Sequence, residues 1–98
     1  MDEPEKYSEY APATDALSGP CPLPIGVDQL DADAVREVSP GDHVVFQVRI
    51  IECLWMNARV LRDGGDQVRV LLLDDAEGIG PVYTDIPREC LAGKVTEQ

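Results

Sequence analysis

The sequence predicts a mostly β fold: a small antiparallel barrel preceded by a largely disordered or extended acidic N-terminal segment, with at most one short helix. The first supporting observation is that residues 39–92 contain short runs with an apolar residue at every second position, separated by turns rich in glycine. The second is the length of 98 residues, which leaves room for one core. A barrel is favoured over an open sheet because closure removes exposed strand edges.

The first 42 residues differ from the rest in charge and proline content. They hold ten acidic residues, two basic residues and six of the eight prolines, and so carry a net charge of −8 out of −11. Residues 1–26 show no helical or strand periodicity, so we expect an acidic, proline-rich flexible segment there. Residues 27–38 form either a short helix capped by Asp28 or Asp31, or a solvated linker.

The segment at residues 19–27 has two interpretations. It alternates small or proline residues with apolar ones, which is typical of an extended, polyproline-like path. It either lies along the barrel or acts as a linear motif that docks into another protein.

Four strands and a closing turn are predicted within residues 39–92, followed by a C-terminal tail at 93–98. The predicted elements are strands at 43–49, 55–62, 67–74 and 81–84, and a single helical turn within 85–91. The sequence Asp63-Gly64-Gly65-Asp66 predicts a hairpin between the second and third strands, because glycine adopts positive φ without strain.

Charge and the cysteine and histidine content argue against several classes of function. A net charge of −11 disfavours binding to a nucleic-acid backbone. The acidic N-terminus and the lack of an 18-residue apolar run predict a soluble intracellular protein, cytoplasmic or nuclear. Cys21, Cys53 and Cys90 are 32 and 37 residues apart, and we expect reduced thiols. With His43 as the single histidine, we predict no metal, no cofactor and no catalytic centre.

Residues 39–92 resemble the Tudor domain, a small bent barrel of the SH3-like kind. The segments that carry the resemblance are Pro40-Gly41-Asp42-His43-Val44, Trp55-Met56-Asn57-Ala58-Arg59-Val60, residues 68–75 and residues 86–91. Tudor domains typically read methylated arginine or lysine through a cage of three or four aromatic rings. Repeated extended Tudor domains act as scaffolds in germline small-RNA (piRNA) silencing complexes. The resemblance therefore implies an extended Tudor-like interaction module, and it places that module in RNA silencing.

The cage positions implied by this resemblance are mostly not aromatic in this sequence. They fall on Val48, Met56 and Asp75, and Tyr83 is the one ring expected near the same mouth. Trp55 is expected to pack into the core. We therefore predict a degenerate cage without useful affinity for methylarginine. A reader of methylated tails that uses an unusual cage is the alternative.

An apolar loop gives the clearest partner-binding signal in the sequence. Four of the five residues 50–54 are apolar, more than a solvated turn requires. Together with an acidic rim, the residues predicted to hold a protein partner are Ile50, Ile51, Cys53, Leu54, Asp75, Glu77 and Tyr83. The alternative is that Ile50 and Leu54 face inward and extend the core.

The favoured function is a non-enzymatic protein–protein interaction module that acts as a scaffold or adaptor, without direct contact to nucleic acid or membrane. A second class is an acidic nucleic-acid mimic that inhibits a basic host protein. An enzyme is the third class. The acids at 74, 75, 77 and 85 supply carboxylates that suit catalysis, but they lack the ligand spacing of an EF-hand calcium loop. A second copy of the chain could also add to the edge of the strand at 81–84.

Overall fold

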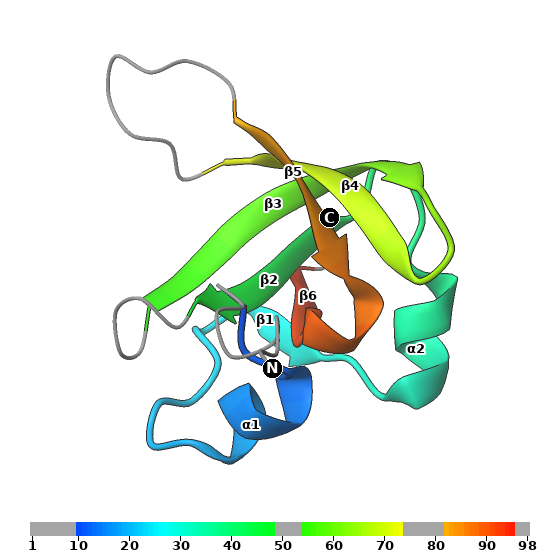
Figure 1. The fold of residues 1–98 in the computed structure, drawn as a ribbon. Helices are drawn as coiled ribbons and strands as arrows, with labels where there is room; N and C mark the ends of the chain where they lie inside the picture. Colours follow the sequence, from blue (N-terminus) through cyan, green and yellow to red (C-terminus); the bar gives the residue numbers. More distant parts are fainter. Residues whose placement is uncertain (1–9, 49–53, 74–81, 96–98) are drawn as a thin grey trace, which may run out of the picture.

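The fold is built on one antiparallel sheet, shown in Figure 1. The computed structural model describes residues 10–48, 54–73 and 82–95. Its strands are β1 (Val27–Gln29), β2 (His43–Val48), β3 (Leu54–Asp63), β4 (Gln67–Leu72), β5 (Tyr83–Pro87) and β6 (Gly93–Val95). Its helices are α1 (Ala13–Ser18), α2 (Ala32–Glu37) and the 3-10 turn η2 (Arg88–Cys90). The strands lie in the order β1-β6-β2-β3-β4-β5.

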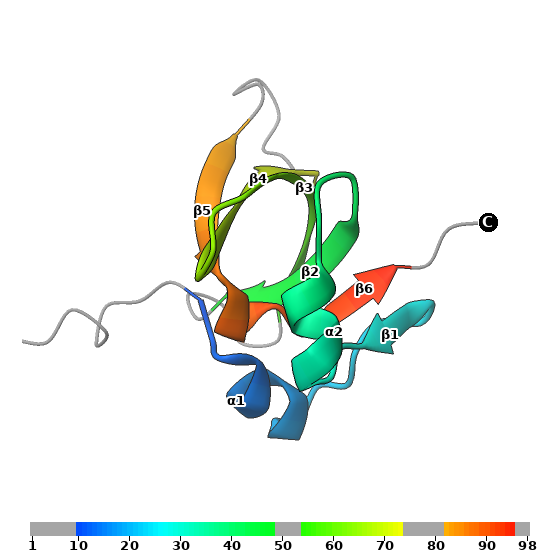
Figure 2. The ribbon, with the colours of Figure 1, turned by 90° about the vertical axis from the view of Figure 1, so that its right-hand side faces the viewer.

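The sheet is strongly bent, so that β2, β3, β4 and β5 curve around a common core (Figure 2). The core forms because apolar residues alternate along each of these strands and their side chains share the inner face. The inward-facing strand residues with at most 1% exposure are Val44, Phe46, Ala58, Val60, Val68, Val70 and Ile86, and the same cluster includes Leu30, Val38, Cys90 and Leu91. Each large side chain buried in this way contributes about 1.5–3 kcal/mol. The predicted mostly β, barrel-like fold is confirmed.

The first three predicted strands are present as β2, β3 and β4, while the fourth is displaced along the chain. β5 continues to Pro87 because residues 85–87 pair with residues 67–69 of β4. The expected helical turn is correspondingly reduced to η2. β1 and β6, which pair with each other, were not predicted because three residues are too few to show a period of two.

The hairpin between β3 and β4 turns at residues 63–66, as predicted. Gly65 has a φ of 85°, and the Gly64 N–H donates to the Gln67 carbonyl over 2.9 Å. A shift of register between Val60 and Arg62 marks a bulge just before the turn. The bulge changes which side chains face each other, and it places Arg62 opposite Arg69.

Residues 10–18 pack on the barrel, which corrects the expectation of a flexible segment for this part of residues 1–26. Helix α1 contacts β2, and Ala16 is 1% exposed. Val45, whose side chain points away from the barrel core by strand alternation, is fully buried. The Ala11 N–H also donates to the Gln47 carbonyl on β2 over 2.9 Å. The contacts use small alanine side chains, so the sequence carries no apolar periodicity that would reveal them.

Helix α2 confirms the short helix predicted within residues 27–38, at a reduced length. Asp31 is its N-cap, and the Asp31 carboxylate accepts a hydrogen bond of 2.7 Å from the Ala34 N–H. The preceding residues Val27–Gln29 form β1 instead.

Cys21 does not agree with the expectation that the cysteines are reduced thiols. Cys21 is disulfide-bonded, whereas Cys90 takes part in no disulfide and is buried in the core. Cys53 lies outside the described residues. Cysteine spacing in the sequence does not exclude a disulfide, because the bond requires only that the folded chain bring two Cα atoms to within about 4.4–6.8 Å, whatever their separation in sequence.

Arg88 joins α2 to the β3–β4 hairpin. Its side chain is 13% exposed. Its guanidinium donates to the Val35 carbonyl over 2.7 Å and to the Asp63 carboxylate over 2.7 Å. It also donates to the carbonyls of Val38 and Gly65. Arg88 therefore supplies charged donors to carbonyls at the C-terminal end of α2, where the Val35 carbonyl also accepts a hydrogen bond of 3.4 Å from the Val38 N–H.

Acidification is expected to weaken this connection through Asp63. A hydrogen bond from the Gly65 N–H and a second one from Arg88 lower the pKa of Asp63 below 3.8. A carboxylate with a depressed folded-state pKa stabilises the fold above its unfolded pKa, and the stabilisation is lost as the pH falls through the folded value. The free energy of unfolding of the wild type should therefore exceed that of Asp63→Asn near neutrality, and the gap should narrow below pH 3.8. Urea unfolding across a pH series measures this gap, and a gap independent of pH contradicts the prediction.

Candidate functional site

The residues predicted to form a degenerate cage do not come together. Val48 and Met56 pack against the core cluster on the inner face of β2 and β3. Tyr83 precedes the inward-facing Thr84 on β5, so strand alternation turns its side chain to the outer face, where it is 54% exposed. Asp75 lies outside the described residues. The structure thus separates Tyr83 from the other two cage positions that it describes.

Tyr10 occupies the space between β2 and β5 on the inner side. Its backbone forms an antiparallel bridge with Val48. Its ring packs edge-on against Phe46, with 5.4 Å between ring centroids and 80° between ring planes. The Tyr10 hydroxyl and Thr84 Oγ1 are 3.1 Å apart and share a hydrogen bond. A half-buried tyrosine from the N-terminal segment therefore lies against the predicted cage position Val48, a contact that sequence reasoning missed.

Trp55 also differs from its expected place in the core. Met56, Ala58 and Val60 face inward, so alternation puts Trp55 on the outer face of β3. It is half-buried there, and its indole Nε1 is buried without a hydrogen-bond partner among the described residues.

The predicted partner-binding residues are only partly described. Leu54 is half-buried and lies two residues from Met56 on β3, so both side chains share the inner face. This agrees with the alternative in which Leu54 faces inward. The predicted residues that lie outside the described residues are Ile50, Ile51, Cys53, Asp75 and Glu77. Of this set the structure describes Leu54 and Tyr83, and Tyr83 is the exposed one of the two.

An exposed apolar surface surrounds Tyr83 on the outer face of β4 and β5. Leu71 pairs directly with Tyr83 across the two strands. Leu73 lies two residues beyond Leu71, and its N–H donates to the Asn57 carbonyl over 2.8 Å, which continues the ladder past the end of β4. Leu73 is 39% exposed and Leu71 is half-buried. Because residues two apart share a face, Leu71, Leu73 and Tyr83 form one surface, the β4–β5 patch.

Sequence reasoning identified Tyr83 but not its two apolar neighbours. Leu71 and Leu73 belong to a run of three leucines, which predicts a strand covered on both faces. The structure leaves the outer face of that strand open at Leu73. An unequal exposure of this kind depends on which elements pack on the sheet, and the strand's own sequence does not encode it.

Comparison with known proteins gives no match: no family model, no curated protein and no solved structure matches this chain. None of the helices in the described residues is long and apolar enough to cross a membrane. Within residues 10–48, 54–73 and 82–95, no three His, Cys, Asp or Glu side chains are grouped so that they could hold a metal ion. The function of the β4–β5 patch is therefore inferred from its own geometry and chemistry.

Proposed function

We propose that this chain is a non-enzymatic protein-interaction module, a Tudor-like adaptor that holds an apolar segment of a partner protein on the β4–β5 patch. The observation that carries the proposal is the exposure of Tyr83 and Leu73 beside Leu71 on one open sheet face. Aromatic side chains at interfaces supply much of the binding energy, because they exchange a large area of water contact for protein contact. The patch offers such an anchor without an aromatic cage.

A further observation supports binding at the patch. Tyr10 packs where a methylated side chain would need open ring faces, which favours the patch over the reader alternative. Membership of a small-RNA silencing complex has the sequence resemblance as its support and remains a prediction.

Substitutions in the patch are expected to abolish binding without unfolding the protein. A peptide-display library tiled over the source proteome is selected against the full chain, and the affinity of synthetic peptides is measured by calorimetry. Peptides with apolar side chains should bind, and the double variant Leu73→Ser, Tyr83→Ser should weaken their binding by at least about tenfold. Ile25→Ser is the matched control, because Ile25 is fully exposed but lies outside the patch.

Circular dichroism must first show that both variants fold. Selected peptides whose affinity is the same for wild type and the patch variant would contradict the proposal, as would a library that yields no binding peptide. Binding that ignores the patch but disappears between low and physiological salt would also contradict it, and would favour the acidic-mimic alternative.

A further inference from the structure

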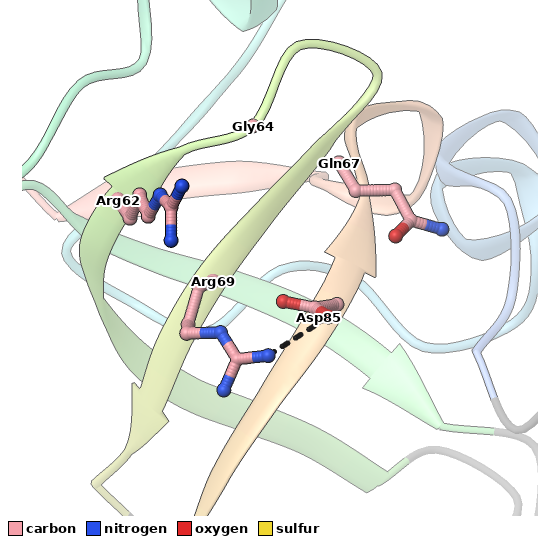
Figure 3. Close-up of a pocket in the computed structure, with 5 residues that line it drawn as sticks. All are labelled: Arg62, Gly64, Gln67, Arg69 and Asp85. Carbon is pink, nitrogen blue, oxygen red and sulfur yellow. Dashed lines mark hydrogen bonds and ion pairs between the residues drawn. The ribbon is translucent and has the colours of Figure 1, made fainter.

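A small polar pocket lies on the same outer face as the β4–β5 patch, next to the β3–β4 hairpin (Figure 3). It has a volume of about 230 Å³ and is lined by Arg62, Gly64, Gln67, Arg69 and Asp85. Cross-strand pairing builds its floor, because Arg62 is opposite Arg69 and Arg69 is opposite Asp85. Two guanidinium groups and one carboxylate therefore lie in a single row across β3, β4 and β5.

The two arginines are not equally neutralised. Arg69 forms an ion pair with Asp85, with 3.2 Å between Nη2 and Oδ2. Arg62 makes no hydrogen bond or ion pair to any residue that the structure describes, and it is exposed. Like charges placed directly opposite each other in a ladder destabilise a sheet. The guanidinium of Arg62 is the one of this pair that is open to a ligand. The row carries one net positive charge on a chain whose net charge is −11.

We propose that this pocket binds the carboxylate of an aspartate or glutamate side chain in the partner segment. Arg62 presents a planar set of N–H donors that suits a carboxylate, and the side-chain amide of Gln67 is exposed at the same pocket. Asp85 and the chain's overall negative charge disfavour a phosphate or a polyanion, because these carry more than the single negative charge that the row can balance. The occupant is therefore an acidic residue within a peptide.

The position of the pocket also constrains the peptide, and this step rests on the proposed function. Arg69 and Leu71 are two residues apart on β4, and Asp85 and Tyr83 are two residues apart on β5. Neighbouring positions on one face of a strand are about 7 Å apart. One short extended segment can thus reach the pocket and the β4–β5 patch together, which predicts a motif with an acidic residue next to apolar ones.

The test is a double-mutant cycle on the peptides selected for patch binding. Arg62→Gln removes the charge, and Arg36→Gln on α2 is the matched control, because Arg36 is an exposed arginine that does not line the pocket. Replacing the acidic residue of the peptide by its amide, or Arg62 by glutamine, should each weaken binding about five- to tenfold. Both changes together should weaken it no further than either alone, because they remove the same interaction.

Charge exchange gives a second readout. Arg62→Glu should weaken the binding of the acidic peptide, and a peptide with lysine at the acidic position should recover part of the loss. Equal affinity of wild type and Arg62→Gln, or additive losses in the cycle, would overturn the carboxylate site. If those peptides still lose affinity in the Leu73→Ser, Tyr83→Ser variant, the proposed function stands without the site. If no peptide depends on the patch, the function itself has failed.

Discussion

Replacing Arg88 by methionine is expected to lower the free energy of unfolding by about 3 kcal/mol, and the melting temperature by roughly 15 °C. Methionine retains the apolar stem of the side chain but removes every donor of the guanidinium. The carbonyls of Val35 and Val38 then lose a charged partner at a site where the side chain is 13% exposed. The hairpin loses its link to α2 at the same time, since Asp63 is bonded to the same group.

Two comparisons separate this connection from a general effect of removing charge. Arg36→Met removes an exposed arginine from α2 and should change stability by less than about 0.5 kcal/mol. Arg88→Lys keeps the charge but replaces a planar fork by a single ammonium, so it should restore less than half of the loss. Urea unfolding monitored by circular dichroism measures all three variants. A loss from Arg88→Met no larger than from Arg36→Met would contradict the structural role.

The barrel strands were predictable because the residue pattern that indicates each of them lies within the strand and its adjacent turn. Residues 44, 46 and 48 place an apolar side chain at every second position, and the glycines at 64 and 65 mark a turn without reference to the rest of the chain. β1, β6 and α1 were not predictable, because each is short and is held by contacts with distant residues. The packing of α1 on β2 depends on alanine side chains, and alanine is compatible with almost any local structure.

The candidate surfaces were predictable in part, for a related reason. A sequence shows which side chains are present, but the face on which each lies depends on strand register. Tyr83 was expected near Val48 and Met56, yet alternation on β5 places it on the other side of the sheet. The facing of Arg62 and Arg69 depends on a bulge of one residue, and no residue type in that segment signals a bulge.

Removal of the Tyr10 ring is the second large effect that we expect. The ring contacts Phe46, the Tyr10 hydroxyl bonds Thr84, and the backbone pairs with Val48, so one residue connects β2 to β5 where β6 no longer pairs with β2. Tyr10→Ala should lower the free energy of unfolding by about 3 kcal/mol, because it removes an aromatic side chain that packs on the core. Tyr10→Phe keeps the ring and should cost about 1 kcal/mol through the lost hydrogen bond.

Tyr83→Ala is the matched control for this prediction, since it deletes the same side chain from a position that is 54% exposed. It should change stability by less than about 0.5 kcal/mol, while it removes part of the β4–β5 patch. Chemical denaturation of the three variants gives the comparison. Equal effects of Tyr10→Ala and Tyr83→Ala would mean that Tyr10 does not hold β2 and β5 together. A large loss of stability in Tyr10→Ala but not in Tyr83→Ala would show that Tyr10 stabilises the barrel. Tyr83 would then be available to contact a partner.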